Sequence, residues 1–261
     1  MSGWFNPETT LAPTAWPFLT LVGLVAGFLN VLAGGGSLMT LPTLIFFGLP
    51  AGVANGTNRV AIVIQNFGAV RSMKRRGRLD RAWVVLAVPP AVLGAVVGMM
   101  IAVRTPDADL QRVLAVAMLC LAAWIVLNPV CPPPEGEAAP VPVGLRRRLF
   151  AVGFFVVGLY GGFIQAGVGF VILALATGGG LDFVRSTALK LTLVLAFTPL
   201  ALVGFASQGL VDWGAGLALA VGNLAGALLG VRLAVRKGGE WLRVVVVALV
   251  VVFAVALWVR A

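Results

Sequence analysis

Histidine is absent from this chain of 261 residues, and cysteine and charged side chains are scarce. Without histidine, the chain lacks the usual ligand of haem and zinc and the side chain best suited to proton transfer near neutral pH. The two cysteines, Cys120 in an apolar run and Cys131 in a proline-rich loop, form neither a disulfide framework nor a metal-ligand spacing. The sequence therefore predicts no cofactor and no bound metal.

Acidic side chains are also few, and all nine map to loops or to the ends of apolar segments. Proton relays inside membranes normally use carboxylates or histidine, so these absences weigh against obligatory proton antiport. The chain has no GxxxxGK[ST] motif and hence no ATPase of its own. It also has no nucleophile–base pair and no long soluble domain, which leaves a membrane enzyme or an assembly factor as the weaker alternatives.

Apolar residues dominate what is present. Hydrophobic residues make up 60% of the chain and charged residues 11%, with a mean hydropathy of +1.04, whereas ordinary soluble domains are about a quarter charged. The basic residues, which give a formal net charge of +10, cluster at the ends of apolar segments, as the positive-inside rule describes. The sequence thus predicts an all-α, polytopic membrane protein that has the lipid bilayer, and not nucleic acid, as its partner.

Ten apolar segments are separated by glycine, proline and charge. A helix needs roughly 20 residues to cross the hydrocarbon, and the first, second, sixth and seventh segments are at or below the lower end of that range. Glycine-rich breaks divide the two short pairs, AGGGS at 33–37 and QAGVGF at 165–170. Each pair is either two tilted short helices or one re-entrant hairpin. The segments span 17–32, 37–49, 53–70, 82–103, 110–128, 149–165, 169–179, 184–206, 213–235 and 241–259.

The two halves of the chain repeat each other at a nearly constant spacing. Arg59 matches Lys190 at an offset of 131 residues. Matches at an offset of 132 or 133 extend across almost the whole half, which indicates a tandem repeat. The matched residues are Gly34, Gly36, Gly77, Asp80, Gly94, Gly98 and Arg104 with Gly167, Gly169, Gly209, Asp212, Gly226, Gly230 and Arg236.

Charge then orients the two halves. The loop RSMKRRGRLDR at 71–81 contains six basic residues and is expected to be cytoplasmic. Its counterpart SQGLVD at 207–212 contains none, and the positive charge lies one loop later, in RKGGEWLR at 236–243. We therefore predict inverted repeats of five segments, with both termini outside the cell. The predicted divisions are an extracytoplasmic tail (1–16), a first membrane repeat (17–128), a cytoplasmic proline-rich linker (129–148) and a second, inverted repeat (149–261).

Inverted repeats with broken helices are typical of secondary transporters, which bind substrate near the midplane at helix termini. Arg59 and Lys190 each lie early in an apolar segment that has no acidic residue, where a charge costs at least ~2.5–3.5 kcal/mol. An anion from outside the chain is their natural counter-charge. The residues predicted to bind this small anionic substrate are Arg59, Lys190, Asn55, Thr57, Asn58, Ser186, Thr187, Gln165, Gly34, Gly35, Gly36, Gly167 and Gly169.

Structural explanations exist for the same residues. Arg59 and Lys190 could snorkel to the lipid headgroups, and the glycines could serve close helix packing. Gln65, Asn66 and Gln165 could line the substrate path or form hydrogen bonds between helices.

Several motifs resemble a known family. GFLNVLAGGGSLMTLPTLIFFGLP from Gly27, VANGTN from Val53, GLYGGFIQAGVGF from Gly158, and the later VDW and GALLG elements are similar to the TauE/SafE family of sulfite and organosulfonate exporters. The resemblance covers roughly residues 20 to 259 and implies a bacterial inner-membrane anion exporter that hydrolyses no ATP. In this chain the family's GT element is followed by Asn58 and Arg59, and its second glycine motif reads GVG.

The predicted function is export of a small sulfur oxyanion by alternating access. In a cell that is negative inside, the membrane potential favours anion export by about 2.3 kcal/mol per charge per 100 mV. An anion channel, or a carrier of another small organic anion, would use the same residues. The sequence leaves open which anion is carried, which ion is coupled and whether the protein forms a homodimer.

Overall fold

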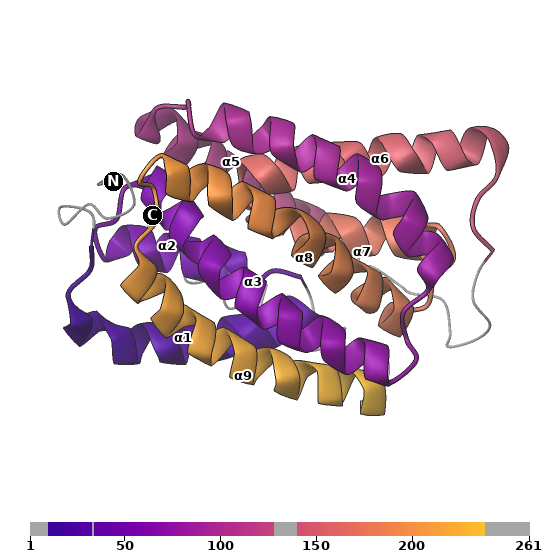
Figure 1. Cartoon of the computed structure of the whole chain (residues 1–261), viewed down its shortest axis with the longest axis horizontal. Helices are drawn as coiled ribbons and strands as arrows, with labels where there is room; N and C mark the ends of the chain where they lie inside the picture. The colour runs from indigo at the N-terminus through magenta and orange to yellow at the C-terminus, as the bar shows by residue number, and fades with distance from the viewer. Residues whose placement is uncertain (1–9, 33, 128–139, 238–261) are drawn as a thin grey trace.

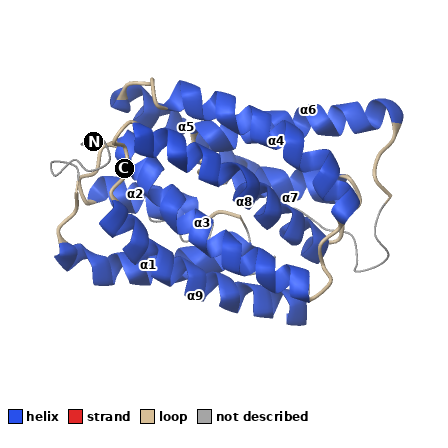
Figure 2. Ribbon diagram, in the orientation of Figure 1, coloured by secondary structure: helices blue, strands red, loops and turns tan. Residues whose placement is uncertain are grey.

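The computed structural model describes residues 10–32, 34–127 and 140–237, which form helices and connecting loops with no strand among them (Figure 2). The tenth predicted segment, 241–259, and most of the predicted linker lie outside these residues. The first nine predicted segments each correspond to one helix. They are α1 (Trp16–Leu32, preceded by the 3₁₀ turn η2, Pro13–Ala15), α2 (Ser37–Phe46), α3 (Ala51–Arg75), α4 (Arg81–Ala102), α5 (Asp107–Leu127), α6 (Gly144–Phe163), α7 (Val168–Gly178), α8 (Phe183–Ser207) and α9 (Trp213–Lys237).

Two helices are longer than the apolar segments that predicted them. α3 continues to Arg75 through part of the basic loop, and α6 begins at Gly144, ahead of three arginines. Apolar continuity marks only the part of a helix that lies in hydrocarbon, whereas the backbone hydrogen bonds can continue into the headgroup region. Side chains fix other boundaries, because Asp80 accepts hydrogen bonds from the first N–H groups of α4 and Asp182 does so for α8.

Length and composition make four of the described helical segments able to cross a membrane. These are Pro13–Leu32, Arg81–Ala102, Phe183–Ser207 and Trp213–Val235, while α2 and α7 are shorter apolar helices of 10 and 11 residues. At each glycine-rich break the chain forms two separate helices. Together with the all-helical fold, these spans make the chain a polytopic membrane protein, as the sequence predicted.

Glycines hold two helix pairs in close contact, α1 with α9 and α4 with α6. A methyl group at Gly94 would lie 2.0 Å from the carbonyl oxygen of Phe155, and one at Gly98 would lie 2.0 Å from that of Leu159. Because the contact advances in the same direction along both helices, α4 and α6 run parallel. Small residues allow such close backbone approach between membrane helices. Figure 1 shows the α1–α9 pair along the lower side of the molecule and the α4–α6 pair along the upper side.

Helices α3 and α8 lie between these two pairs and contact each other (Figure 1). Met73 near the end of α3 packs in one cluster with Val184 at the start of α8, whereas Gly56 near the start of α3 lies beside Phe205 near the end of α8. The two helices therefore run antiparallel. The first half of α3, Ala51–Ile62, is buried on every face, which explains how a helix with so many polar residues fits the interior.

Helices at similar positions in the two halves of the chain make similar contacts. The α1–α9 contact corresponds to α6–α4, the α3–α9 contact to α8–α4, and the α2–α3 contact to α7–α8. The antiparallel α3–α8 contact is the arrangement that an inverted repeat requires, because helices related by an axis in the membrane plane point in opposite directions.

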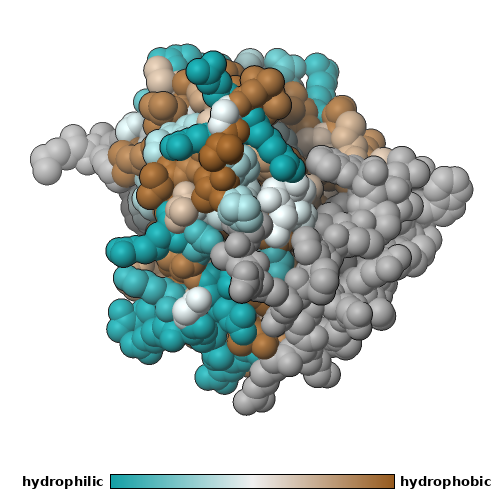
Figure 3. Space-filling model, turned by 90° about the vertical axis from the view of Figure 1, so that its right-hand side faces the viewer, coloured by the Kyte–Doolittle hydropathy of each residue, from teal (hydrophilic) through white to brown (hydrophobic). Residues whose placement is uncertain are grey.

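Basic residues gather at one end of the bundle. Helix α3 ends there in exposed Lys74 and Arg75, and α4 and α6, which run parallel, both begin there, α6 with the exposed run 146–148. Figure 3 looks onto this end and shows hydrophilic residues around an apolar middle. The opposite end carries Arg104 and Arg112 together with acidic residues of α5.

Candidate functional site

The two glycine-rich breaks touch each other in the middle of the molecule. A methyl group at Gly169 would lie 2.5 Å from the Cα atom of Gly34, so the two backbones are in direct contact. Gly34 and Gly167 have φ angles of +88° and +66°, a region that residues with a Cβ rarely occupy. The backbone turns sharply at both breaks, which brings the start of α2 close to the start of α7.

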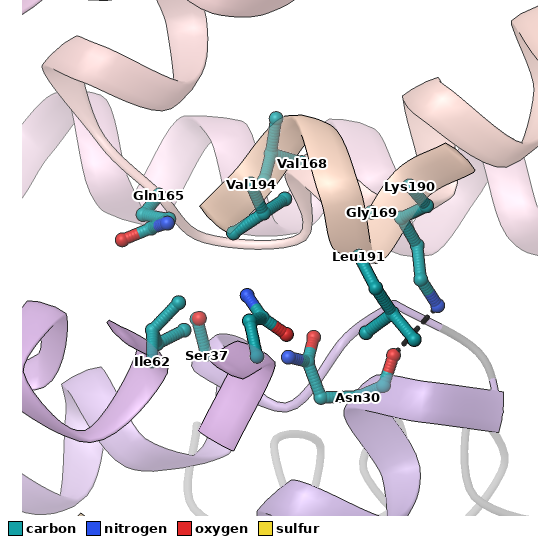
Figure 4. A pocket seen from close by; sticks show the side chains of 10 residues that line it. Asn30, Ser37, Ile62, Gln165, Val168, Gly169, Lys190, Leu191 and Val194 are labelled. Carbon is teal, nitrogen blue, oxygen red and sulfur yellow. Dashed lines mark hydrogen bonds between the residues drawn. The ribbon is translucent and has the colours of Figure 1, made fainter. Parts of the chain in front are cut away.

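A small cavity lies where the breaks meet, with room for about one water molecule (Figure 4). The N-terminal residues of α2 and α7 line it, and helix N-termini favour anions through unpaired N–H groups and the helix dipole. The lining residues are Asn30, Ser37, Ile62, Asn66, Gln165, Val168, Gly169, Lys190, Leu191 and Val194, none of which is acidic.

Lys190 is the one charged side chain among the lining residues, and it is 2% exposed. Its Nζ atom donates hydrogen bonds to the carbonyl oxygens of Asn30, at 2.7 Å, and Val31, at 2.8 Å. These carbonyls lie in the last turn of α1, where the helix dipole is negative. The Asn30 carbonyl also accepts a hydrogen bond from the backbone N–H of Gly34 at 3.0 Å. An ammonium group has three N–H bonds, so these two leave a third for a ligand.

Arg59 does not line the cavity, although it is fully buried. Its Nη2 atom donates to the carbonyl oxygen of Gly162 at 2.7 Å and to Oδ1 of Asn55 at 3.3 Å, while Nη1 donates to the carbonyl oxygen of Gly161 at 3.2 Å. The guanidinium also lies 4.7 Å from the ring centroid of Phe205, a cation–π distance. Arg59 thus binds the end of α6 much as Lys190 binds the end of α1.

The structure moves the predicted pairing of these two cations by one residue. α3 and α8 begin and end at an offset of 132 residues, which places Lys190 opposite Asn58 in the repeat and Arg59 opposite Leu191. Their side chains point to different helix ends, because Arg59 donates to carbonyls of α6 and Lys190 to carbonyls of α1. Membrane burial had seemed to leave both cations without a partner. Helix-end carbonyls supply one, which accounts for their burial without snorkelling.

The other predicted polar residues divide between the cavity and helix ends. Gln165 lines the cavity, and its Nε2 donates to the hydroxyl of Thr198 at 2.7 Å. Asn58 donates to the hydroxyl of the lining residue Ser37 at 3.3 Å. Asn55 donates to the last carbonyl of α6, at Phe163, over 2.7 Å.

Three predicted residues, Thr57, Ser186 and Thr187, do not line the cavity. The hydroxyl of Thr57 accepts a hydrogen bond from the backbone N–H of Asp212 at 2.8 Å. The hydroxyl of Ser186 donates to the carbonyl oxygen of Leu181 at 3.2 Å. The Thr187 hydroxyl is buried without a hydrogen-bond partner in the part of the chain that the structure describes.

The predicted glycines occupy the breaks in different ways. Besides Gly34, Gly167 and Gly169, Gly36 precedes α2 and packs against the backbone of α1, since a methyl group there would lie 2.3 Å from the carbonyl oxygen of Ala26. A methyl group at Gly35 would meet the ring of Phe170 at 2.5 Å. These glycines therefore allow close packing of the backbone at the breaks, beside the cavity.

Two polar lining residues, Asn30 and Ser37, were predicted neither as binding residues nor as possible path residues. Both were visible in the sequence, Asn30 as a single amide in an apolar run and Ser37 as the last letter of AGGGS. Asn66, which the sequence left open between path and packing, also lines the cavity. Its Nδ2 atom and Oε1 of Gln165 have no hydrogen-bond partner among the described residues.

A family model described as sulfite exporter TauE/SafE matches residues 19–257 of the chain. This chain belongs to the TauE/SafE sulfite exporter family.

Relatives of this TauE/SafE member are membrane transporters by name. It is 27% identical over 244 residues to the probable membrane transporter protein ORF9 of a Sinorhizobium species, covering 93% of this chain and 90% of the relative. It is 28% identical over 250 residues to the probable membrane transporter protein YfcA of Escherichia coli K12, covering 93% and 89%. No solved structure matches the chain. The family and the apolar helices make this protein a multi-pass membrane transporter and not an enzyme.

Proposed function

We propose that this transporter exports a small sulfur-containing oxyanion, such as sulfite or an organosulfonate, across the bacterial inner membrane without ATP hydrolysis. The observation that carries the proposal is the cavity where the two breaks meet. It combines the N-termini of two short helices, the Lys190 ammonium and the amide of Gln165, with no carboxylate among its lining residues. These groups favour an anion with oxygen acceptors.

The proposed mechanism is alternating access between two inverted repeats. The cavity lies between α3 and α8, at the contact between the halves, which is where such transporters bind substrate. It has room for about one water molecule, so a sulfur oxyanion would enter only when the surrounding helices move apart. The parallel pairs α1–α9 and α4–α6 are bound internally by backbone contacts and would move as rigid units around it. With the basic end in the cytoplasm, both termini would lie outside.

The test is uptake of labelled sulfite into proteoliposomes at a fixed membrane potential. We expect a saturable flux that unlabelled sulfite on the other side accelerates, and a large loss of that flux in Lys190→Gln. Arg112→Gln is the matched control, because it removes a basic charge from an exposed side chain far from the cavity. Equal flux in both variants would contradict the assigned site, and flux without acceleration from the other side would favour an anion channel.

A further inference from the structure

The cavity contains one positive charge, although two cations are buried nearby. The geometry points to a site for a monoanion: a singly charged sulfonate or hydrogensulfite, with dianions such as sulfate excluded. This inference rests on the proposed function and specifies the charge of its substrate. It is based on the different positions of Arg59 and Lys190, of which only Lys190 lines the cavity.

Arg59 is held away from the cavity by its own contacts. Both of its terminal nitrogens donate to carbonyl oxygens of α6, at Gly161 and Gly162, and the guanidinium also lies over the ring of Phe205. If Arg59 moved to the cavity, those two buried carbonyls would lose their donors, which is unfavourable. The positive charge of Arg59 therefore interacts with the C-terminal end of α6 and not with a ligand in the cavity.

Lys190 alone supplies charge to a ligand in the cavity. It keeps its two carbonyl acceptors, Asn30 and Val31, and has one further N–H bond for an oxygen atom. The other polar lining side chains are three neutral amides, Asn30, Asn66 and Gln165, and the hydroxyl of Ser37. They can solvate an oxyanion but cannot neutralise a second charge.

Balance of charge then decides which anions fit. A monoanion beside Lys190 gives a neutral pair, whereas a dianion leaves one net negative charge in a buried site whose other polar groups are neutral. An uncompensated buried charge is unfavourable even after the surroundings relax. Helix N-termini offset only a part of this cost.

Asn66 and Gln165 add a detail that agrees with this charge. Each has one buried side-chain atom without a hydrogen-bond partner among the described residues, Nδ2 in Asn66 and Oε1 in Gln165. Buried polar atoms are almost always hydrogen-bonded, so both are free to bind a ligand. An unpaired donor and an unpaired acceptor at one cavity suit a ligand that has both oxygen acceptors and a hydroxyl, as the protonated monoanion of sulfite has.

The first experiment compares methanesulfonate with sulfate in proteoliposomes. The two are tetrahedral and similar in size, and they differ by one charge. We expect the KM for methanesulfonate to be at least about tenfold lower, which corresponds to 1.4 kcal/mol. Comparable KM values for the two anions would overturn the inference and leave the proposed function intact. Absence of saturable flux for methanesulfonate and sulfite alike would instead refute the proposed function, and the inference with it.

The second experiment uses the ionisation of sulfite, whose monoanion fraction rises as the pH falls. The ratio of sulfite flux to methanesulfonate flux should therefore rise as the pH falls. Methanesulfonate keeps its charge over this range, so a change in the protein's own protonation affects both fluxes and cancels in the ratio. Lys190 is the only titratable side chain among the lining residues. A ratio that stays constant or falls would overturn the inference.

A variant tests the charge count directly. Asn66→Lys places a second cation among the lining residues and should narrow or reverse the preference for methanesulfonate over sulfate. Asn66→Gln is the matched control, because it keeps a neutral amide, and should retain the preference of the wild type. An unchanged preference in a folded, active Asn66→Lys variant would contradict a selectivity set by cavity charge.

Discussion

Replacing Arg59 by glutamine should destabilise the protein more than it alters substrate binding. The side chain makes one hydrogen bond of 2.7 Å and one of 3.2 Å to the carbonyls that end α6. Hydrogen bonds to charged groups contribute about 1.5–3 kcal/mol each, and the cation–π contact with Phe205 adds about 0.5–2 kcal/mol. Glutamine is shorter and can replace at most one of these bonds. After allowing for relief of the buried charge, we expect a loss of about 3 kcal/mol.

The assay is the free energy of unfolding in detergent, with Arg112→Gln as the control. Arg112 lies on α5 and is exposed, with its Nη1 atom 3.3 Å from the carboxylate of Asp109. Its loss should cost less than about 1 kcal/mol. Arg59→Lys keeps the charge and one or two of the hydrogen bonds, so its stability should be intermediate. Equal stability of Arg59→Gln and Arg112→Gln would refute the assignment of Arg59 to the α6 end and return it to the substrate site.

Other substitutions test the packing, the breaks and a buried carboxylate. Gly158→Ala should lower stability by about 1–3 kcal/mol, because its methyl group would lie 2.0 Å from the backbone oxygen of Ala91. Gly178→Ala is the control and should leave stability unchanged, because the space around Gly178 is open. Equal thermal midpoints for the two variants would contradict this account of the packing. Gly34→Ala should reduce flux per folded molecule, since φ is +88° and Gly169 lies against it; full flux would show that the breaks need not touch. Asp212→Asn should weaken the hydrogen bond from Leu11 N–H and speed hydrogen exchange there, and an unchanged exchange rate would count against that anchor.

Sequence alone was sufficient for the membrane class and for nine helix positions. Apolar runs long enough to cross hydrocarbon have few alternatives, because backbone groups in lipid must be paired within helices. The glycine-rich breaks were visible for the same reason, as places where a run stops too early. Boundaries at Arg75 and Gly144 were missed, since helical hydrogen bonding continues beyond the apolar residues that signal it.

The candidate site was only partly accessible to sequence reasoning. Lys190 and Gln165, two of the predicted side chains, line the cavity. They could be predicted because a polar residue in an apolar segment indicates that it has a buried partner of some kind. The nature of the partner could not be inferred. The carbonyls that Arg59 and Lys190 bind lie 102 and 160 residues away along the chain, and a carbonyl has no signature in a sequence.

Composition and hydrophobic periodicity thus determined that this protein is a helical membrane protein with two glycine-rich breaks. Only the tertiary structure decided what its two buried cations do. They differ by one position in the repeat, and on a helix one position turns a side chain by about 100°. That rotation leaves Lys190 at the cavity and directs Arg59 to the end of α6, so a pair that looks symmetric in the sequence supplies one charge to the site.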